Sequence, residues 1–153
     1  MRDADADILR AARALALVAR ALERAAGASE LTLAQFRVLS LIAAGDERSS
    51  LLADRLSVAK PTITAVVDGL VERGFVARAA VAGDRRSIRV SLTAPGAAAV
   101  QAAEAEMTAA LGRNFEHARD RDALIAALVD LDDALAARSQ SRLREVRGTA
   151  EAK

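Results

Sequence analysis

The sequence predicts a mainly α-helical fold that contains one two-stranded β-hairpin. Apolar residues recur three and four positions apart over most of the 153 residues, which is the periodicity of amphipathic helices. Only the stretch "FVARAAVAGDRRSIRVSLT" alternates as strands do, around a Gly-Asp turn. Of all residues 52% are hydrophobic but only 2% are aromatic, so we expect a core of Leu, Val, Ile and Ala on closely packed helices. The length is typical of a single domain, expected over residues 1–153.

The first helix is predicted from Asp7 to Ala26, and Gly27 is expected to end it. This helix has one apolar seam, because apolar residues follow one another at seven-residue spacing with small or branched residues between them. The seam consists of Ile8, Leu15 and Leu22, with Ala11 or Ala12 and Val18.

A second helix is predicted from Thr32 to about Ala44. Thr32 and Gln35 have the spacing of a capping box, in which each side chain accepts a hydrogen bond from the other residue's backbone N–H. Leu31 and Phe36 occupy the positions of a hydrophobic staple around that box. We expect the buried face of this helix to contain Phe36, Leu39 and Ile42.

Two shorter helices follow, separated by a tight turn. The third helix is predicted from about Ser50 to Leu56, with Ser49 or Ser50 as its N-cap. The fourth begins near Lys60-Pro61, since proline is favoured in the first helical turn, and it stops at Gly74. Its inner face is predicted to hold Ile63, Val66 or Val67, and Leu70, and its outer face Lys60, Thr62 and Thr64. This arrangement is a helix-turn-helix.

The hairpin comes next, with strands predicted over 75–81 and 87–93 and a turn at 82–84. Ile88, Val90 and Leu92 are expected to anchor it to the core. Arg85 and Arg86, with Asp84 beside them, are expected at its tip.

Two long helices complete the chain. Thr93 is predicted to cap the fifth, which has Pro95 in its first turn and runs to about His117. Asp120 or Asp122 is predicted to cap the sixth, which ends near Arg147 before a disordered tail at 148–153. The sixth helix has an apolar seam of leucines: Leu124, Leu128, Leu131 and Leu135.

Charge is distributed unevenly although the formal net charge is only +1. Residues 56–96 contain six basic and three acidic residues, whereas residues 99–137 contain three basic and eight acidic ones. The middle of the chain, with the helix-turn-helix and the hairpin, is therefore the part suited to a polyanionic partner.

Several classes of function are not expected. The chain has no cysteine and one histidine, His117, which cannot build a familiar zinc site within one chain, and we expect no cofactor. No phosphate-binding glycine loop and no Ser/His/Asp arrangement is present, so an enzyme is not expected. No apolar run reaches the roughly 20 residues of a membrane span, and the acidic N-terminus lacks a signal-peptide core. A cytoplasmic protein without membrane contact is the resulting expectation.

Three segments together resemble the MarR family of bacterial transcription regulators. "LTLAQFRVLSLI" resembles the second helix of that family, "LADRLSVAKPTITAVVDGLVERGFVAR" its helix-turn-helix, and "GDRRSIRVSLTAPG" its β wing. The resemblance is close over residues 31–96, and the flanking helices match in position and type. It implies a winged helix-turn-helix lobe at 31–96 between helical dimerisation regions at 1–30 and 97–147.

The resemblance also implies a function: a homodimer that binds a pseudo-palindromic operator in double-stranded DNA, more often as a repressor than as an activator. Many members release DNA when a small aromatic or apolar effector binds, and we expect an apolar effector pocket near the junction of the first, second and fifth helices. The effector, its pocket residues, the operator and the regulated genes are not encoded in any motif of this chain.

Candidate DNA contacts follow from the residues and the motif together. Lys60 is expected at a phosphate and the threonines of the fourth helix at base edges or thymine methyl groups. Arg85 is expected in the minor groove with Asp84 orienting it, while Arg78, Arg86 and Arg89 either flank phosphates or brace the hairpin. The candidate DNA-binding set is Ser50, Lys60, Pro61, Thr62, Thr64, Arg78, Asp84, Arg85 and Arg86.

Two alternatives stay open at this point. The seams of the first and sixth helices, which are Ile8, Leu15, Leu22, Leu124, Leu128, Leu131 and Leu135, either close one monomeric core or bury against a second copy; a homodimer is expected. Ala59 stands where the family commonly has a Ser or Thr cap, and Ala65 offers no hydrogen bond to a base. These two alanines favour the alternative function, a helical protein-interaction module that has lost DNA binding.

Overall fold

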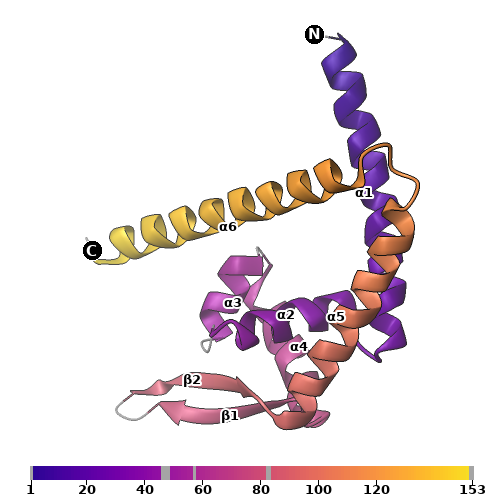
Figure 1. Cartoon of the computed structure of the whole chain (residues 1–153). Helices are drawn as coiled ribbons and strands as arrows, with labels where there is room; N and C mark the ends of the chain where they lie inside the picture. The colour runs from indigo at the N-terminus through magenta and orange to yellow at the C-terminus, as the bar shows by residue number, and fades with distance from the viewer. Residues whose placement is uncertain (1, 46–48, 57, 82–83, 152–153) are drawn as a thin grey trace.

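The computed structural model describes residues 2–45, 49–56, 58–81 and 84–151. Its elements are, in chain order, α1 (Arg2–Ala28), α2 (Leu33–Ala43), α3 (Ser49–Leu56), α4 (Lys60–Glu72), β1 (Val76–Val81), β2 (Asp84–Leu92), α5 (Ala94–Phe115) and α6 (Arg121–Glu151). Figure 1 shows α1 as a long rod that packs along α5, with α2, α3 and α4 gathered beside them and the hairpin projecting from this group. The predicted fold class, mainly α with a two-stranded β wing, is confirmed.

The first helix ends later than Gly27, the residue that the sequence predicted as its stop. Gly27 lies inside α1, and the left-handed position belongs to Glu30, whose φ is 60°. The N–H of Leu31 donates to the carbonyl of Ala26, and the N–H of Glu30 donates to that of Gly27. These two bonds form a Schellman motif. Leu31, fully buried just after the motif, explains why a non-glycine residue is held in this conformation.

The capping box that opens α2 is confirmed. The backbone N–H of Gln35 donates to Thr32 Oγ1 over 3.1 Å, and the N–H of Thr32 donates to Gln35 Oε1 over 2.9 Å. Leu39 and Ile42 are buried as predicted, whereas Phe36 is only partly buried.

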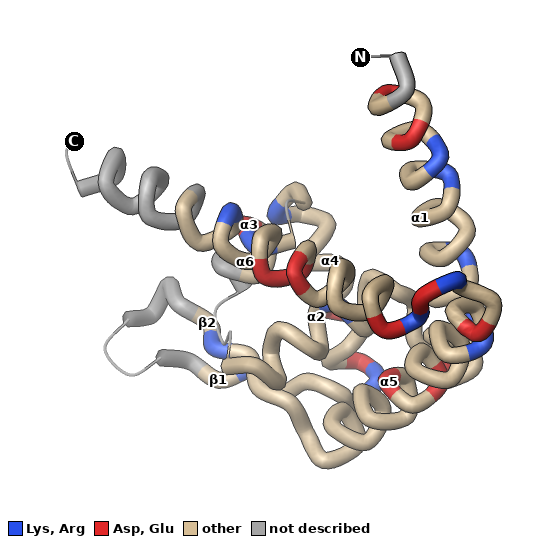
Figure 2. Tube along the Cα trace, turned by 45° about the horizontal axis from the view of Figure 1, so that its top comes forward, with Lys and Arg blue, Asp and Glu red and all other residues tan. Residues whose placement is uncertain are grey.

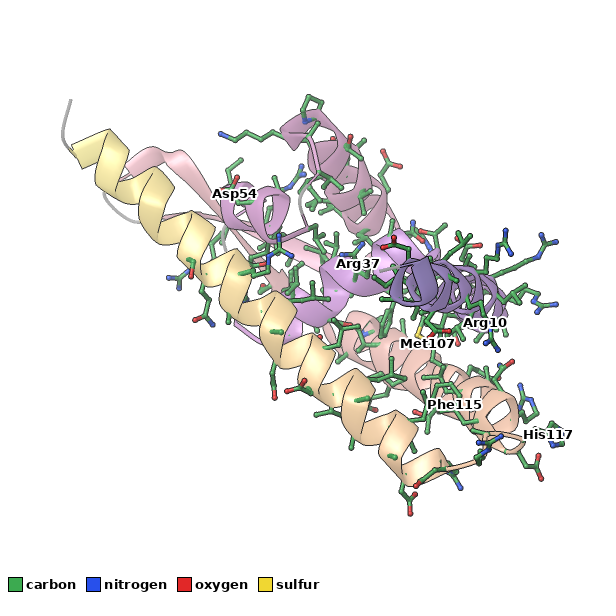
Figure 3. All side chains as sticks on the ribbon, turned by 90° about the horizontal axis from the view of Figure 1, so that it is seen from above. Arg10, Arg37, Asp54, Met107, Phe115 and His117 are labelled. Atoms are coloured by element: carbon green, nitrogen blue, oxygen red, sulfur yellow. The ribbon has the colours of Figure 1, made fainter. Side chains whose placement is uncertain are left out.

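One core joins the small helices to the hairpin and to α5. It consists of Leu31, Val38, Leu39, Ile42, Leu52, Ala53, Ile63, Val67, Leu70, Val76, Val90, Val100 and Ala103. A second cluster, where α1 meets α5, consists of Ala25, Ala26, Met107 and Ala110. Figure 3 shows Met107 at that contact, beneath the end view of α1. Alanine on both helices lets their backbones approach closely, so α1 packs tightly on α5 at this point.

The hairpin differs from the prediction in its turn and in one anchor. β1 and β2 are antiparallel, with Val76 opposite Leu92 and Ala80 opposite Ile88, and the register shifts between Ala80 and Val81. Asp84 belongs to β2 rather than to the predicted turn, and residues 82–83 lie outside the described part of the chain. Val90 is buried, but Ile88 is 49% exposed and therefore does not anchor the hairpin.

The last two helices have the predicted caps. Thr93 Oγ1 accepts a hydrogen bond from the N–H of Gly96, and Asp120 Oδ1 accepts one from the N–H of Ala123, which decides between the two candidate caps of α6. α6 continues to Glu151, beyond Arg147, so the predicted disordered tail is wrong for 148–151; residues 152–153 lie outside the described part.

Candidate nucleic-acid interface

The N-terminal half of α4 presents polar side chains to solvent while its opposite side is buried. Lys60, Pro61, Thr62 and Thr64 are exposed, and the predicted inner residues Ile63, Val67 and Leu70 are 3% exposed or less. Of the two valines that the sequence left open, Val67 is the buried one and Val66 is only partly buried. The lobe therefore holds α4 firmly by one face and leaves the other face free to enter a groove of DNA.

The first turn of α4 forms without a side-chain cap. Ala59 has the extended N-cap conformation, with φ −63° and ψ 140°, but makes no side-chain hydrogen bond. Its carbonyl accepts from the N–H groups of Thr62 and Ile63, so Pro61 and these backbone bonds are sufficient to start the helix. Thr64 Oγ1 donates to the carbonyl of Lys60 over 3.0 Å, which leaves the lone pairs and methyl group of Thr64 for a base edge.

Arg78, a candidate DNA contact, braces the hairpin in this structure. Its Nη2 lies 2.5 Å from Oδ1 of Asp68 on α4. The side chains are 34% and 48% exposed, so the pair is only partly removed from water. This ion pair joins β1 to α4 and favours the bracing alternative over a phosphate contact for Arg78.

Arg73, at the C-cap of α4, contacts the corner between α1 and α2. Its Nη1 donates to the carbonyl of Glu30 over 2.8 Å and lies 3.5 Å from Oε1 of Gln35. The guanidinium carbon sits 4.5 Å from the centre of the Phe75 ring. The partner residues lie 43 and 38 positions away in the sequence, so no local sequence signal pointed to these contacts.

The remaining candidates lie where side chains are not described. Asp84, Arg85 and Arg86 belong to the backbone of β2, and Ser50 to that of α3, but their side chains lie outside the described part of the structure. Their DNA contacts therefore stay predictions. At backbone level, three of them fall on the projecting hairpin that follows α4 (Figure 1).

Charge separates along the molecule as the sequence predicted. In Figure 2 the acidic residues of α6 form red bands along that helix, whereas blue marks described arginines on the hairpin. Asp130, Asp132 and Asp133 are all exposed on α6. The acidic side chains of α6 therefore belong to a different element from the exposed polar face of α4.

Large apolar side chains are exposed along α1 and α6. Ile8 is 68% exposed and Leu15 48%, and on α6 Leu131 is 43% and Leu135 51% exposed. Leu22, Leu124 and Leu128, which the sequence placed in the same seams, are partly buried within the chain. The sequence missed four further exposed residues, Leu9, Leu17, Ile125 and Val129, because they lie beside the seven-residue repeat rather than on it.

Described residues of α6 line cavities with apolar walls on two sides of the helix. One, of about 350 Å³, lies between α5 and α6, with Leu111, Phe115, Ile125 and Leu128 among its walls. The other, of about 440 Å³, lies where α2, α3 and α6 meet; Phe36, Leu41, Leu56 and Leu135 supply its apolar wall, and Arg37, Ser40, Arg55, Asp132 and Ser139 its polar wall.

The second cavity, which we call the α2–α3–α6 cavity, has a hydroxyl group without a partner. Ser40 Oγ is buried and makes no hydrogen bond. Arg37, labelled on α2 in Figure 3, lies one turn before it. The sequence predicted a pocket near the first, second and fifth helices; this cavity shares only α2 with that expectation, because the path of α6 over α3 could not be read from the sequence.

Metal binding and membrane insertion find no support among the described residues. Within residues 2–45, 49–56, 58–81 and 84–151, no group of three or more His, Asp or Glu side chains is placed to hold a metal ion. In the same part of the chain, no helix combines the length and apolar character needed to cross a membrane.

Comparison with known proteins assigns the lobe. A family profile described as the MarR family matches residues 29–87. The HTH-type transcriptional repressor YetL of Bacillus subtilis (strain 168) is 41% identical over 70 residues, which are 44% of this chain and 42% of that protein. The chain thus matches less than half the length of this curated relative.

Solved structures extend the likeness to most of the chain. A MarR-family transcriptional regulator from Rhodococcus sp. RHA1 superposes with a TM-score of 0.75 at 26% identity, over 87% of this chain and 94% of that one. CouR from Rhodococcus jostii RHA1, bound to p-coumaroyl-CoA, gives a TM-score of 0.68 at 26% identity, over 82% and 87% of the two chains. CouR bound to a 23-mer DNA duplex gives 0.72 at 28% identity, over 82% and 89%. With its capped second helix, helix-turn-helix, β wing and flanking long helices, this chain is similar to MarR-family transcription regulators over most of its length, and its residues 29–87 match the model of that family.

Proposed function

We propose that the protein is a homodimeric repressor that binds a pseudo-palindromic DNA operator and releases it when a small effector binds. It acts in the cytoplasm and has no catalytic activity of its own. The observation that carries the proposal is the two-sided character of α4: its inner face is fully buried and its outer face is exposed and polar. The repressor YetL and the DNA-bound CouR, both similar to this chain, support the same conclusion.

DNA binding follows from the position of α4 and the hairpin. The outer face of α4 enters the major groove, where Lys60 contacts phosphate and Thr62 and Thr64 reach base edges. The hairpin follows the backbone to the adjacent minor groove, where Arg85 binds because the negative potential is enhanced there. Phosphate contacts release counterions, so affinity should fall steeply as salt increases.

Dimerisation follows from the exposed apolar side chains of α1 and α6. Leu17 is 71% exposed and Ile8 68% in the single chain, which is unfavourable in water for residues of this size. A second copy of the chain covers such stripes on both protomers at once through a two-fold axis. The same axis places the two α4 helices on successive turns of one DNA face, roughly 34 Å apart.

Effector binding is proposed for the α2–α3–α6 cavity. A volume of about 440 Å³ suits a small aromatic or apolar molecule, and the unpartnered Ser40 hydroxyl can hydrogen-bond a polar group on it. The cavity is bounded by α3 of the helix-turn-helix and by α6 of the dimerisation region. A bound effector would therefore shift the helix-turn-helix relative to the dimerisation region. Such a shift moves α4 and so weakens DNA binding, although the effector does not touch DNA.

The experiment is a fluorescence-anisotropy titration of the purified protein against the DNA upstream of its own gene, at several salt concentrations. We expect specific binding that weakens steeply with salt, and an Arg85→Ala variant that binds at least tenfold less tightly, about 1.4 kcal/mol, while remaining a dimer. Unchanged affinity of Arg85→Ala would contradict the role of the wing. Absence of salt-dependent binding by the wild type would favour the protein-interaction alternative, for which the uncapped Ala59 and the exposed Ala65 are the supporting features.

A further inference from the structure

We propose that Arg73 is a positioning residue that fixes the angle between the recognition helix α4 and the dimerisation helix α1, and so decides which half-site spacing the dimer accepts. The inference rests on the proposed DNA-binding function. It assigns a role to a residue that does not itself touch DNA in the proposed complex, since Arg73 lies at the end of α4 opposite to Lys60.

Arg73 joins the C-terminal ends of two helices. α1 ends in the Schellman motif with Glu30 at its left-handed position. α4 ends in the same motif, with Gly74 in the left-handed position at a φ of 71°. The N–H of Gly74 donates to the carbonyl of Val71, and the N–H of Phe75 donates to the carbonyl of Leu70. Both ends carry partial negative charge from their last carbonyl groups. The guanidinium of Arg73 reaches the carbonyl of Glu30 just after α1, so its positive charge is favourable beside the C-terminal end of that helix.

The contacts of Arg73 are directional. The bond from Nη1 to the Glu30 carbonyl is 2.8 Å long, while the Glu30 carboxylate is farther away, 3.8 Å from Nη2, and its side chain is 87% exposed. The guanidinium also lies over the ring of Phe75, the residue just before β1. A planar group that is held by a backbone carbonyl on one side and by a ring on the other has little freedom to rotate. The backbone bond, rather than the ion pair, therefore holds the end of α4 against the corner between α1 and α2.

The position of this contact gives it leverage over DNA recognition. α4 has 13 residues and is thus about 20 Å long at about 1.5 Å per residue. A rotation of about 10° about its C-terminal end moves its N-terminal residues by about 3.5 Å, close to the roughly 3.4 Å rise of one base pair. α1 packs on α5 and carries exposed apolar side chains that we propose contact the second copy of the chain. A change in the angle between α1 and α4 in each protomer therefore changes the distance between the two α4 helices of the dimer.

The test measures affinity against operator spacing. Wild type and Arg73→Ala are titrated by fluorescence anisotropy against the operator and against versions with one base pair added or removed between the half-sites. We expect wild type to prefer its native spacing at least tenfold, and Arg73→Ala to lower that preference at least threefold while its affinity for the shifted operators stays within twofold of wild type. An equal loss at every spacing, or no loss at all, would overturn the proposal, since a purely structural brace would not change the ratio.

Three further variants sharpen the result. Arg73→Lys keeps the charge and one donor, and should give an intermediate spacing preference even if Arg73→Ala folds poorly. Glu30→Gly keeps the backbone carbonyl that accepts from Arg73, and glycine suits the left-handed conformation, so we expect this variant to keep the spacing preference of wild type. A spacing preference as low as that of Arg73→Ala would overturn the conclusion that the bond to the Glu30 carbonyl positions α4. Arg113→Ala removes an exposed arginine from the last turn of α5 and should leave the preference unchanged; if it reproduces the effect, loss of charge alone is responsible and the proposal fails.

Failure of this proposal can be told from failure of the proposed function. Wild type that binds none of the operators overturns DNA binding and, with it, the role of Arg73. Wild type that binds with a sharp spacing preference, shared fully by Arg73→Ala, overturns only the role of Arg73.

Discussion

Replacing Gly96 by alanine should destabilise the protein, although alanine is the better helix former. Gly96 lies in the first turn of α5, and a Cβ atom there would be 2.0 Å from the carbonyl oxygen of Phe75 and 2.9 Å from its carbonyl carbon. Ordinary contact begins near 3.4 Å, so the two backbones would have to separate by about 1.4 Å. Neither partner is a flexible side chain that could turn away.

The separation has a direct cost, because the Phe75 carbonyl is already used. It accepts a hydrogen bond from the N–H of Thr93 over 3.1 Å, and Thr93 Oγ1 donates to the neighbouring Gly74 carbonyl over 2.6 Å. Overpacking typically costs about 1–3 kcal/mol, and a weakened hydrogen bond about 1 kcal/mol more. Helix propensity returns up to about 1 kcal/mol. The net loss in the free energy of unfolding is therefore about 2 kcal/mol, which lowers the Tm by about 4–8 °C.

Thermal unfolding followed by circular dichroism measures this loss. Gly69→Ala is the matched control, since Gly69 lies inside α4 and a Cβ atom there meets nothing within 4 Å. That variant should gain up to about 1 kcal/mol from helix propensity. If Gly96→Ala has the same Tm as wild type or a higher one, as Gly69→Ala should, the close approach of α5 to the backbone of Phe75 is not a constraint and the reasoning is refuted.

Three other predictions concern the start of α4 and the surface of α1. Ala59→Ser should raise the free energy of unfolding by about 0.5–1 kcal/mol in chemical denaturation, because a serine at this extended N-cap can accept from the N–H of Thr62; no gain would mean that this turn is already satisfied. Lys60→Ala should weaken binding to all DNA sequences and lower the slope of log affinity against log salt by about 1, whereas an unchanged slope would remove Lys60 from the phosphate contacts. Ile8→Asp should convert the dimer to a monomer in sedimentation equilibrium with little change in the helical signal, because Ile8 is 68% exposed in the single chain; a dimer that persists would place the interface elsewhere.

Most elements of the fold could be predicted because their signals are local. The capping box of Thr32 and Gln35, the proline at the start of α4 and the caps Thr93 and Asp120 each involve residues within one helical turn. Such signals act within a few residues and depend little on the rest of the molecule. The errors fell where packing overrides them: at Glu30, which adopts the left-handed conformation that was assigned to a glycine, and at Ile88, which alternates correctly but extends beyond the core.

The candidate interface divides in the same way. Helical periodicity alone predicted that the polar residues at the start of α4 face outward and that Ile8 lies on the apolar seam of α1. The partners of the arginines did not follow from it. Arg78 pairs with Asp68 on another element, ten residues away, although the sequence offered equally plausible roles at phosphate.

The sequence by itself therefore determined the order of helices and strands, the starts of the helices after α1 and the polar face of α4, because caps, prolines and periodicity are written within single segments. The start of α1 was wrong, since this helix begins at Arg2 rather than at Asp7. Only the tertiary structure decided that α6 passes over α3 to form the α2–α3–α6 cavity, and that Arg73 reaches a carbonyl 43 residues away. Both depend on how helices far apart in the sequence pack against each other. That packing follows from the whole core at once, so no single stretch of residues encodes it.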